Sequence, residues 1–399
     1  MKRYIITLSE AHDDMERVQG ALIRMGLNPG RAAEELFEGQ PREFTFLPEL
    51  GILIAALSEI EMETIEQDGA VLAIEEDGKE QILGVVERSG SILHNSTALW
   101  NMQLIRADVV WPTGKFGTGI RVAVIDTGIA EHPNLHIYGG QSYVAGVQSY
   151  ADDNGHGTHC AGIIAGKGRN NVFGVAIGAH LYAVKALDST GSGSTSAILS
   201  GMDWCIQNRM QVISISLGGR RAPDIGYIRA IKKCHDNNIV VVCASGNSFG
   251  SAFPWVNAPA NSFTRGDDLE SPIAVASVDR NKVVAGSSSR GGQTADWNQI
   301  NLSAPGVSIL STFLNFGYAT MSGTSMACPH VAGLAALVLE AYPGIAPPIV
   351  MALMATSATP LGTAPYPNEP YGHGIIDCVN AVGLVQAKRE LPRVTSPSG

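Results

Sequence analysis

The sequence predicts an α/β protein with a parallel sheet covered by helices on both faces, preceded by a small α+β domain. From about residue 112 onward, short apolar runs rich in β-branched residues alternate with helical segments, a pattern typical of parallel sheets buried on both faces. Residues 1–94 follow a different order of strands and helices and carry the excess of acidic residues. We therefore divide the chain into a small domain (1–94), a large domain (95–390) and a flexible tail (391–399).

The small domain is expected to have a ferredoxin-like fold. Helices are predicted over 13–26, where apolar residues recur at helical spacing, and over 58–67. Strands are predicted at YIITL, at two segments on either side of a Pro-Glu turn, and at AVLAIEED. The resulting order βαββαβ is that of ferredoxin-like domains.

The large domain is expected to contain five apolar strands with helices between them. Helices are predicted over 194–210 and 222–238, and a segment rich in Ser, Asn, Pro and Gly (248–270) predicts a surface loop. Ligands of open parallel sheets bind at the carboxyl ends of the strands, so functional residues are expected there. The predicted strands are 121–125, 181–187, 211–217, 239–245 and 271–278.

Composition and charge exclude several classes of protein. Hydrophobic residues make up 45% of the 399 residues and charged residues 16%, which is typical of a folded chain. Residues 1–94 hold 8 Lys and Arg against 19 Asp and Glu, which indicates either a solvated surface or a domain with its own role. The chain has no basic stripe and no apolar run of about 18 residues, so neither nucleic acid nor a membrane is expected as a partner.

The amino terminus and the cysteines give information on the cellular compartment of the protein. The first residues contain only the short apolar run IITL, whereas a secretory signal has an apolar region of roughly 7–15 residues. The protein is expected to be intracellular if the chain is complete as given, and secreted if a leader has been removed. The six cysteines form no CxxC pair, so buried free thiols are expected, with disulfides as the alternative.

Two of the candidate functional residues lie at a strand end and a helix start. Asp126 follows the apolar strand RVAVI, and a buried carboxylate there needs a partner unless it only caps a turn. His156 opens an apolar helical run between glycines, which leave its ring room to meet a substrate. The nearby His159 suggests a metal pair, but the HExxH pattern is absent and a structural role is expected.

Two further candidates are a serine and an asparagine. Ser325 lies where a Gly-Thr turn becomes a long apolar helix, as either a helix N-cap or a residue in the field that favours an anion. The stretch is not a GxSxG elbow, because Ala327 occupies the second glycine position. Asn247 follows a strand and a glycine, and its amide could donate to an oxyanion.

The motifs VAVIDTGI, HGTHCAG, SLGG, ASGN and SGTSMACPHVAG occur in this order. Together they resemble the subtilisin-like serine proteases (subtilases) over most of the chain. The resemblance implies a subtilisin-like fold and an endopeptidase with Ser325 as nucleophile, His156 as general base and Asp126 orienting the histidine. Asn247 and the backbone N–H of Ser325 would then hold the oxyanion. This chemistry requires no cofactor.

The resemblance also implies how a peptide substrate is held. Two segments are expected to pair with its backbone as extended strands, although GSGSTS also fits a plain flexible loop. Thr195 stands where the family commonly has a large aromatic residue, which implies a roomier pocket for the fourth residue before the cut. The expected substrate-binding residues are Gly191, Ser192, Gly193, Ser194, Thr195, Ser216, Leu217, Gly218, Gly219 and Gly246.

The chain departs from the family pattern at one metal site and resembles one branch at a cysteine. Asn134 replaces the Asp ligand of a tight calcium site, so that site is expected to be weakened, while structural calcium elsewhere stays open. No other metal is expected. Cys160 resembles the thiol that one branch has behind its histidine, which implies sensitivity to mercurials. Cys328 is expected to pack in the core.

Residues 1–94 then resemble a subtilase propeptide, which acts as an intramolecular chaperone and a temporary inhibitor. The implied protein is a monomeric zymogen that acts on peptides and proteins. It is expected to cut itself between His94 and Asn95, or within about four residues of that bond, and to leave residues 91–94 in the cleft. The alternative is a catalytically silent binding or regulatory protein in which the small domain stays docked in the cleft.

Overall fold

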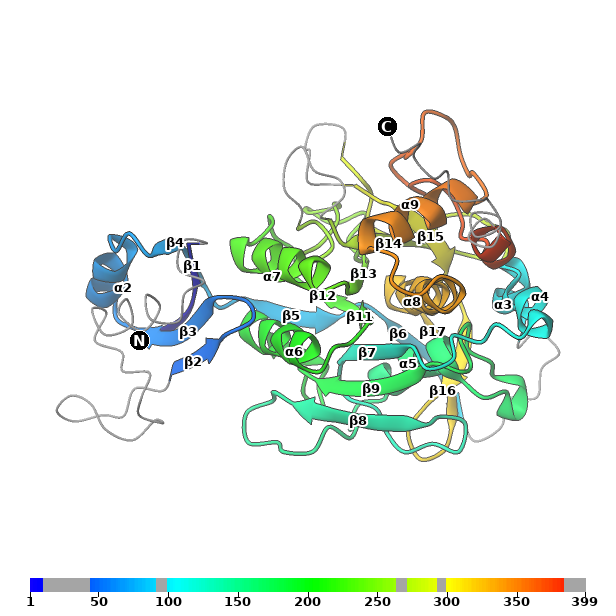
Figure 1. Cartoon of the computed structure of the whole chain (residues 1–399), viewed down its shortest axis with the longest axis horizontal. Coiled ribbons are helices and arrows are strands. Elements are labelled where there is room, and N and C mark those ends of the chain that lie inside the picture. Colours follow the sequence, from blue (N-terminus) through cyan, green and yellow to red (C-terminus); the bar gives the residue numbers. More distant parts are fainter. Residues whose placement is uncertain (10–43, 91–98, 263–270, 293–298, 384–399) are drawn as a thin grey trace, which may run out of the picture.

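The computed structural model describes residues 1–9, 44–90, 99–262, 271–292 and 299–383. A small unit and a large α/β unit lie side by side, and a strand leads from the first into the second (Figure 1). The helix predicted over 13–26 and the tail 391–399 lie outside the described residues.

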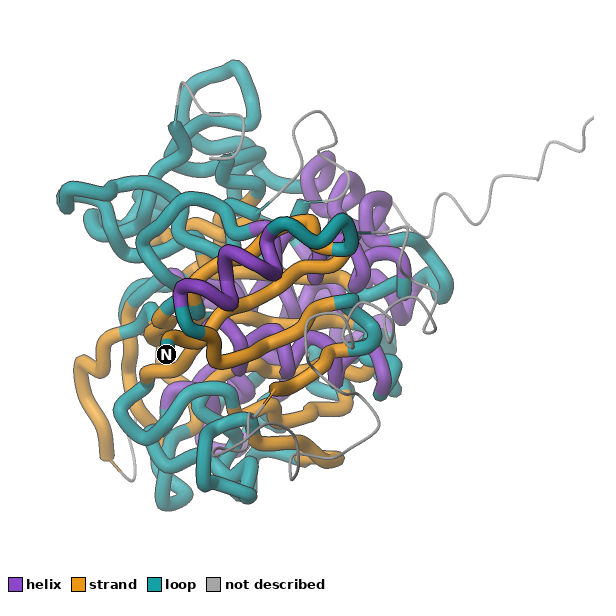
Figure 2. The backbone as a smooth tube through the Cα atoms, turned by 90° about the vertical axis from the view of Figure 1, so that its left-hand side faces the viewer, coloured by secondary structure: helices purple, strands orange, loops and turns teal. Residues whose placement is uncertain are grey.

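The small unit is a four-stranded antiparallel sheet with a helix on its outer face (Figure 2). Its order β2-β3-β1-β4 fits the predicted βαββαβ arrangement. Helix α2 (Glu59–Glu66) begins with a capping box, in which the side chains of Ser58 and Glu61 accept hydrogen bonds from each other's backbone N–H. The strands are β1 (Lys2–Leu8), β2 (Phe44–Leu47), β3 (Ile52–Leu57) and β4 (Val71–Glu76).

The two faces of this sheet have different partners, because side chains alternate along a strand. Tyr4, Ile6 and Leu8 of β1 pack with Ile65 of α2 in a small core of their own. Ile5 points to the opposite face and belongs to a core that it shares with the large unit. The small unit is thus docked on the large one through an apolar face of its sheet.

The large unit contains a seven-stranded sheet in which every neighbouring pair is parallel. All five predicted strands are present. Two edge strands were not predicted, because glycine and serine interrupt the apolar pattern of IYGGQS and LSAP. In sheet order the strands are β15 (Leu302–Pro305), β14 (Ile273–Val278), β13 (Val240–Ala244), β11 (Val212–Ile215), β7 (Arg121–Asp126), β9 (His180–Lys185) and β8 (Ile137–Ser142).

Helices cover both faces of this sheet, as predicted. Along β7, Val122 and Val124 belong to one core and Ala123 and Ile125 to the other. The first core includes residues of α5 (His156–Ala165), α8 (Thr324–Ala341) and α9 (Pro347–Ser357), and the second those of α6 (Thr195–Gln207) and α7 (Ile225–Asp236). Short helices complete the unit: α3 (Trp100–Leu104), α4 (Ala107–Val110), η2 (Trp111–Thr113) and η3 (Arg169–Asn171).

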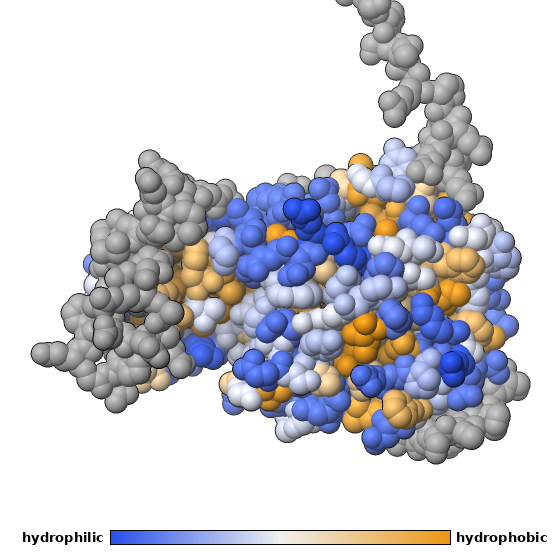
Figure 3. All heavy atoms as spheres, turned by 60° about the horizontal axis from the view of Figure 1, so that its bottom comes forward, coloured by the Kyte–Doolittle hydropathy of each residue, from blue (hydrophilic) through white to orange (hydrophobic). Residues whose placement is uncertain are grey.

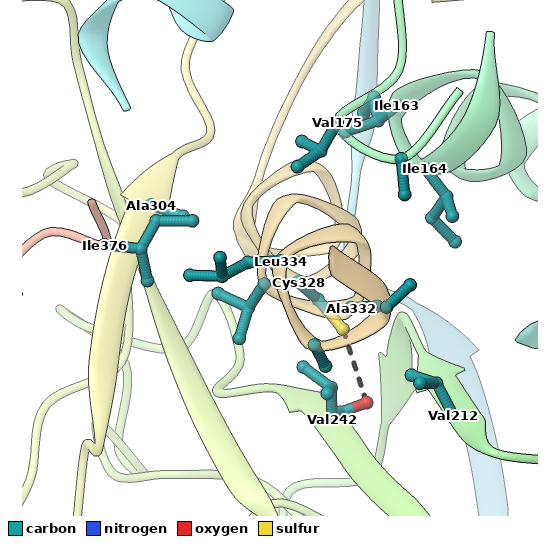
Figure 4. Packing of buried hydrophobic residues seen from close by; sticks show 14 of the residues in the cluster. Ile163, Ile164, Val175, Val212, Val242, Ala304, Cys328, Ala332, Leu334 and Ile376 are labelled. Atoms are coloured by element: carbon teal, nitrogen blue, oxygen red, sulfur yellow. Dashed lines mark hydrogen bonds between the residues drawn. The ribbon is translucent and has the colours of Figure 1, made fainter. Parts of the chain in front are cut away.

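Helix α8 runs through the first core, with Cys328 and Leu334 among its buried side chains (Figure 4). Cys328 packs in this core as expected, and its Sγ lies 3.4 Å from the carbonyl oxygen of Val242. The sequence was expected to contain no apolar run long enough to span a membrane. Contrary to this expectation, α8 has the length and hydropathy of a membrane span, and it is the one such helix among the described residues. It is a core helix, because 94% of it is buried inside the protein.

The surface carries both hydrophobic and hydrophilic residues. On the face shown in Figure 3, hydrophobic patches lie between hydrophilic residues. Such a mixture is ordinary, since apolar atoms contribute a large share of any folded surface.

The segment 248–270 is only in part the predicted surface loop. Val256, Ala258 and Asn261 are fully buried or nearly so. Ala258 and Gly219 exchange two backbone hydrogen bonds of 3.0 Å, which bring the segment against the strand ends. Composition did not reveal this, because buried turns that satisfy their polar groups internally use the same residue types as exposed ones.

The segment that connects the two units joins two antiparallel sheets of the large unit. β5 (Lys79–Ile82) lies between β10 (Ser192–Ser194) and β12 (Leu217–Gly218). β6 (Val85–Gly90) pairs with β17 (Tyr318–Ser322), which also pairs with β16 (Ile309–Thr312). The boundary predicted at residue 94 lies outside the described residues.

Candidate active site

Asp126 and His156 form a buried pair. Asp126 is the last residue of β7, and His156 is the first residue of α5. Nδ1 of His156 lies 2.8 and 3.0 Å from the two carboxylate oxygens of Asp126, and neither side chain is exposed. Because the carboxylate oxygens of Asp126 accept from Nδ1, a neutral ring carries its proton on Nδ1, and Nε2 is free to accept a proton.

Ser325 lies close to this pair but does not cap its helix. It is the second residue of α8, whose N-cap is Gly323, so the N-cap alternative is excluded. Its hydroxyl donates a 2.7 Å hydrogen bond to the carbonyl oxygen of Ser216. Nε2 of His156 is buried and has no hydrogen-bond partner in the described part of the chain.

A peptide bond of the chain itself lies against these groups. The carbonyl oxygen of Leu83 accepts hydrogen bonds from Nδ2 of Asn247 (2.5 Å) and from the backbone N–H of Ser325 (3.3 Å). On the other side of the bond, a Cβ atom added to Gly84 would lie 2.9 Å from Nε2 of His156. The Leu83–Gly84 bond is therefore in contact with three of the four predicted polar residues.

The two segments predicted to hold a peptide backbone hold β5 of this chain. Gly193 pairs with Glu80 on one side, and Leu217 pairs with Ile82 on the other. Both segments are strands here rather than a flexible loop. Further backbone contacts run from the N–H of Ile82 to Gly191 (3.0 Å), from that of Leu83 to Ser216 (3.4 Å) and from that of Thr195 to Gly78 (3.0 Å).

Three glycines that were predicted to bind substrate, Gly218, Gly219 and Gly246, have different neighbours. A Cβ atom on Gly218 would lie 3.4 Å from Cδ1 of Leu83, the side chain that precedes the bond. A Cβ atom on Gly219 would lie 3.0 Å from Oε2 of Glu80, so Gly219 lies beside that side chain and not beside Leu83. Gly246 has a φ of +111°, which allows the turn after β13.

The predicted processing site, His94 and Asn95, lies outside the described residues. Residues 80–83 lie along the two segments predicted to bind substrate, whereas residues 91–94, which were predicted to lie in the cleft, are also outside the described residues. The cut was predicted next to the domain that carries the catalytic motifs. The last strand of the small unit already ends at Glu76, so a short extended segment suffices to reach Ser325.

The residues around His156 have structural roles. His159 is the structural histidine that was expected, with Nε2 at 3.0 Å from the carbonyl oxygens of both Ile309 and Ala319. Burial lowers the pKa of His159 to about 3. Sγ of Cys160 lies 3.5 Å from the carbonyl oxygen of Ser325, and burial raises the pKa of this thiol. All six cysteines are buried and free, as expected.

One group of residues has metal-ligand composition in the described part of the chain. Asp126, His156 and Cys160 have potential ligand atoms within 4.8 Å of one another. The direct contact between Asp126 and His156 leaves no place for an ion between them. The thiol of Cys160 is also held in its neutral form by burial, whereas a metal would require the thiolate.

Asn134, at the position of the weakened calcium site, is committed to the protein. Its side chain accepts a 2.8 Å hydrogen bond from the N–H of Arg169 and donates one of 2.8 Å to the carbonyl oxygen of Val172. It is fully buried. The amide thus anchors the loop that follows α5, and it does not fit the role of a calcium ligand.

A polar pocket beside the cleft was predicted only in part, since a roomier pocket was expected at Thr195 but its polar partners were not. The carboxylate of Glu80 contacts Arg221, Thr195 and Tyr227, which come from three different segments of the large unit. No local pattern marks Arg221 and Tyr227, since an arginine after paired glycines and a tyrosine on an amphipathic helix are common anywhere. Only the positions of Glu80 and these partners in space reveal the site.

Comparison with known proteins shows that the chain is similar to subtilisins and alkaline proteases. A family model described as "Subtilase family" matches residues 117–374. A thermostable alkaline protease of Halalkalibacterium halodurans is 37% identical over 329 residues, 82% of each chain. Subtilisin DY of Bacillus licheniformis is 42% identical over 284 residues, 70% of this chain and 97% of that protein. An alkaline protease of Alkalihalobacillus alcalophilus is 35% identical over 336 residues, 84% of this chain and 79% of that protein.

Proposed function

This chain belongs to the subtilase family and is a subtilisin-like serine endopeptidase, and we propose that Asp126, His156 and Ser325 carry out its peptide hydrolysis. One observation carries this proposal. The carbonyl oxygen of Leu83 lies between two N–H donors while the other side of its peptide bond lies against His156. This is the position that a substrate bond must occupy for attack by Ser325.

The reaction follows from these positions. Once its hydroxyl turns from Ser216 toward Nε2 of His156, Ser325 attacks the carbonyl carbon while His156 takes the proton. Asp126 holds the other ring nitrogen, keeps the tautomer and stabilises the imidazolium. His156 then returns the proton to the departing amine. Water, activated by the same histidine, hydrolyses the acyl-enzyme.

Two donors would stabilise the oxyanion. Nδ2 of Asn247 and the backbone N–H of Ser325 already contact the carbonyl oxygen of Leu83, at 2.5 and 3.3 Å. Preorganised donors of this kind stabilise the charge that develops on the oxygen in the transition state without reorganising during the reaction.

We further propose that the protein is a zymogen that cuts its own Leu83–Gly84 bond. Gly84 leaves room for His156, which any side chain would crowd. After the bond the chain lies at the surface, where Val85 is 67% and Val86 46% exposed. The new amino terminus could leave the cleft by separating from β17, with which β6 pairs, whereas β5 would stay between its two neighbouring strands.

The small unit is well placed to act as the inhibitor. Glu75 accepts hydrogen bonds of 2.8 Å from the N–H groups of Ile225 and Gly226 at the start of α7. Asp77 accepts bonds from the N–H (2.9 Å) and hydroxyl (2.6 Å) of Ser196 at the start of α6. Helix N-termini favour negative charge. These contacts and the apolar sheet face would keep β5 in the cleft until the small unit is released or degraded.

Two measurements on the purified protein test the proposal. A fluorophosphonate probe should label Ser325 after the small unit is removed, and Ser325→Ala should not be labelled. Amino-terminal sequencing of the large fragment should begin at Gly84. Absence of labelling after proteolytic removal of the small unit would contradict the enzymatic proposal. A large fragment beginning at Asn95 would contradict only the proposed processing bond.

The competing proposal is a catalytically silent binding or regulatory protein. Two observations favour it: the hydroxyl of Ser325 is bonded to Ser216, and the cleft is filled. In that case the Leu83–Gly84 bond would stay intact and Ser325 would stay unlabelled even in the isolated large unit. The same two measurements therefore separate the alternatives.

A further inference from the structure

Glu80 is a carboxylate buried at the edge of the proposed cleft. Its side chain is completely shielded from solvent. Its Oε1 accepts hydrogen bonds from the hydroxyl groups of Tyr227 (2.8 Å) and Thr195 (2.9 Å), and from the guanidinium of Arg221. Counted from the Leu83–Gly84 bond, Glu80 is the fourth residue on the amino-terminal side.

The large unit holds the guanidinium of Arg221 in place. Its Nε donates to both carboxylate oxygens of Asp224, at 2.8 and 3.1 Å. The backbone carbonyl of Arg221 accepts a 2.9 Å hydrogen bond from the side chain of Asn261. The guanidinium lies 5.8 Å from the ring centroid of Tyr227, which is fully buried. The cation is therefore oriented by residues that do not belong to the small unit.

Burying a carboxylate without partners would be strongly unfavourable. Burial does raise the pKa of Glu80, while the charge and hydrogen bond of Arg221 oppose that rise. Charge-assisted hydrogen bonds are stronger than neutral ones. The guanidinium of Arg221 contacts the carboxylates of Asp224 and Glu80. A neutral side chain in place of Glu80 would leave it with Asp224 alone.

The surroundings of the second carboxylate oxygen of Glu80 also define the pocket. Oε2 of Glu80 is buried and has no hydrogen-bond partner in the described part of the protein. It lies over Gly219, where an added Cβ atom would be 3.0 Å away. Thr195, at the position where the family commonly has a large aromatic residue, thus donates to a carboxylate instead of closing an apolar pocket.

We propose that Arg221, Thr195 and Tyr227 form a specificity site that selects substrates with a glutamate at the fourth residue before the cleaved bond. The inference rests on the proposed hydrolytic function and names its substrate class. All three residues belong to the large unit, so the site persists after the small unit has left. An aspartate is one methylene shorter and would not reach all three donors.

The test uses the self-processed enzyme, with active sites counted by the fluorophosphonate probe. Acetylated peptides of the form Xaa-Gln-Ile-Leu, carrying a chromogenic leaving group, repeat residues 80–83 with Glu, Gln, Asp or Leu in the first place. We expect kcat/KM for Glu to exceed that for Gln by about 10- to 100-fold, as for loss of charge-assisted hydrogen bonds. Because the contacts exist in the bound ground state, most of the difference should appear in KM.

Arg221→Gln should bring the ratio of Glu to Gln cleavage close to one. Arg220→Gln is the matched control, because it removes the same charge from the exposed neighbouring residue and should keep the ratio. If Arg220→Gln lowers the ratio as much as Arg221→Gln, long-range charge and not the pocket is responsible, and the inference is wrong. The wild-type peptide series decides the question even if the Arg221 variant fails to fold.

The outcomes separate this inference from the function on which it rests. If Ser325 is labelled and Gln or Leu peptides are cut as fast as the Glu peptide, the specificity site is wrong and the hydrolytic function stands. If Ser325 is not labelled and no peptide is cut, both are wrong.

Discussion

Nδ2 of Asn247 lies 2.5 Å from the carbonyl oxygen of Leu83, a residue 164 positions earlier in the chain. The other end of the same amide accepts a 3.0 Å hydrogen bond from the N–H of Thr324, so its orientation is set from α8. This one side chain therefore links the connecting segment of the small unit to the helix that carries Ser325.

Asn247→Ala should lower kcat by about 10²–10³ and leave KM nearly unchanged, because its donor acts mainly on the oxyanion of the transition state. Steady-state kinetics on a chromogenic peptide measures both constants. Probe labelling counts the folded sites, so a loss of labelled protein would be separated from a loss of rate. A rise in KM with unchanged kcat would contradict the role assigned to Asn247.

Ser325→Ala should reduce hydrolysis by about six orders of magnitude, since nucleophile and base act as a unit. The variant should also accumulate as the full-length chain, which electrophoresis and mass measurement can follow. Appearance of the Gly84 terminus in pure Ser325→Ala protein would show that another protease makes the cut.

Gly84→Ala should slow self-processing, because its Cβ atom would lie 2.9 Å from Nε2 of His156 and 3.2 Å from Sδ of Met326. Gly69→Ala is the matched control, since an added Cβ atom there meets nothing within 4 Å. The rate of disappearance of the full-length chain measures the effect. Equal rates for the two variants would place the scissile bond elsewhere.

The docking of the small unit should respond to pH through Asp203 of α6. Its Oδ1 accepts hydrogen bonds from the N–H groups of Glu49 (2.9 Å) and Leu50 (3.3 Å) in the small unit. Burial raises the pKa of Asp203 from 3.8 to about 6. Because the folded protein binds this proton more tightly than the unfolded chain, the contribution of Asp203 to stability is largest below pH 3.8 and is lost as the pH rises to about 6.

This effect can be measured in the uncut Ser325→Ala protein. Asp203→Asn keeps an acceptor but cannot ionise. As the pH rises between 4 and 6, the free energy of unfolding of the double variant should therefore increase relative to that of Ser325→Ala alone. Denaturant unfolding at several pH values gives the difference. A difference that does not change with pH would show that Asp203 does not titrate in this range.

An organomercurial should inactivate the enzyme through Cys160, whose Sγ lies 3.5 Å from the carbonyl oxygen of Ser325. Inactivation should be slow, because the thiol is fully buried and burial raises its pKa. Cys160→Ser should keep most of the activity and resist the reagent. Cys378→Ser, which removes another buried thiol, should remain sensitive.

The sequence determined most of the architecture and the identity of the chemical groups. The five central strands are continuous apolar runs, and α2 carries its capping box in its own sequence. Such signals depend on neighbours a few residues apart, so they can be found without the fold. The motifs containing Asp126, His156, Asn247 and Ser325 are local in the same way.

Only the tertiary structure decided which bond lies in the cleft and what surrounds Glu80. The contact between Arg221 and Glu80 joins residues 141 positions apart, and it exists because the sheet of the small unit docks on α6 and α7. No spacing in the sequence encodes that docking, since it depends on one apolar sheet face and on carboxylates that meet two helix N-termini. For this reason neither the position of the Leu83–Gly84 bond nor the contacts of Glu80 with Arg221 and Tyr227 could be predicted from the sequence.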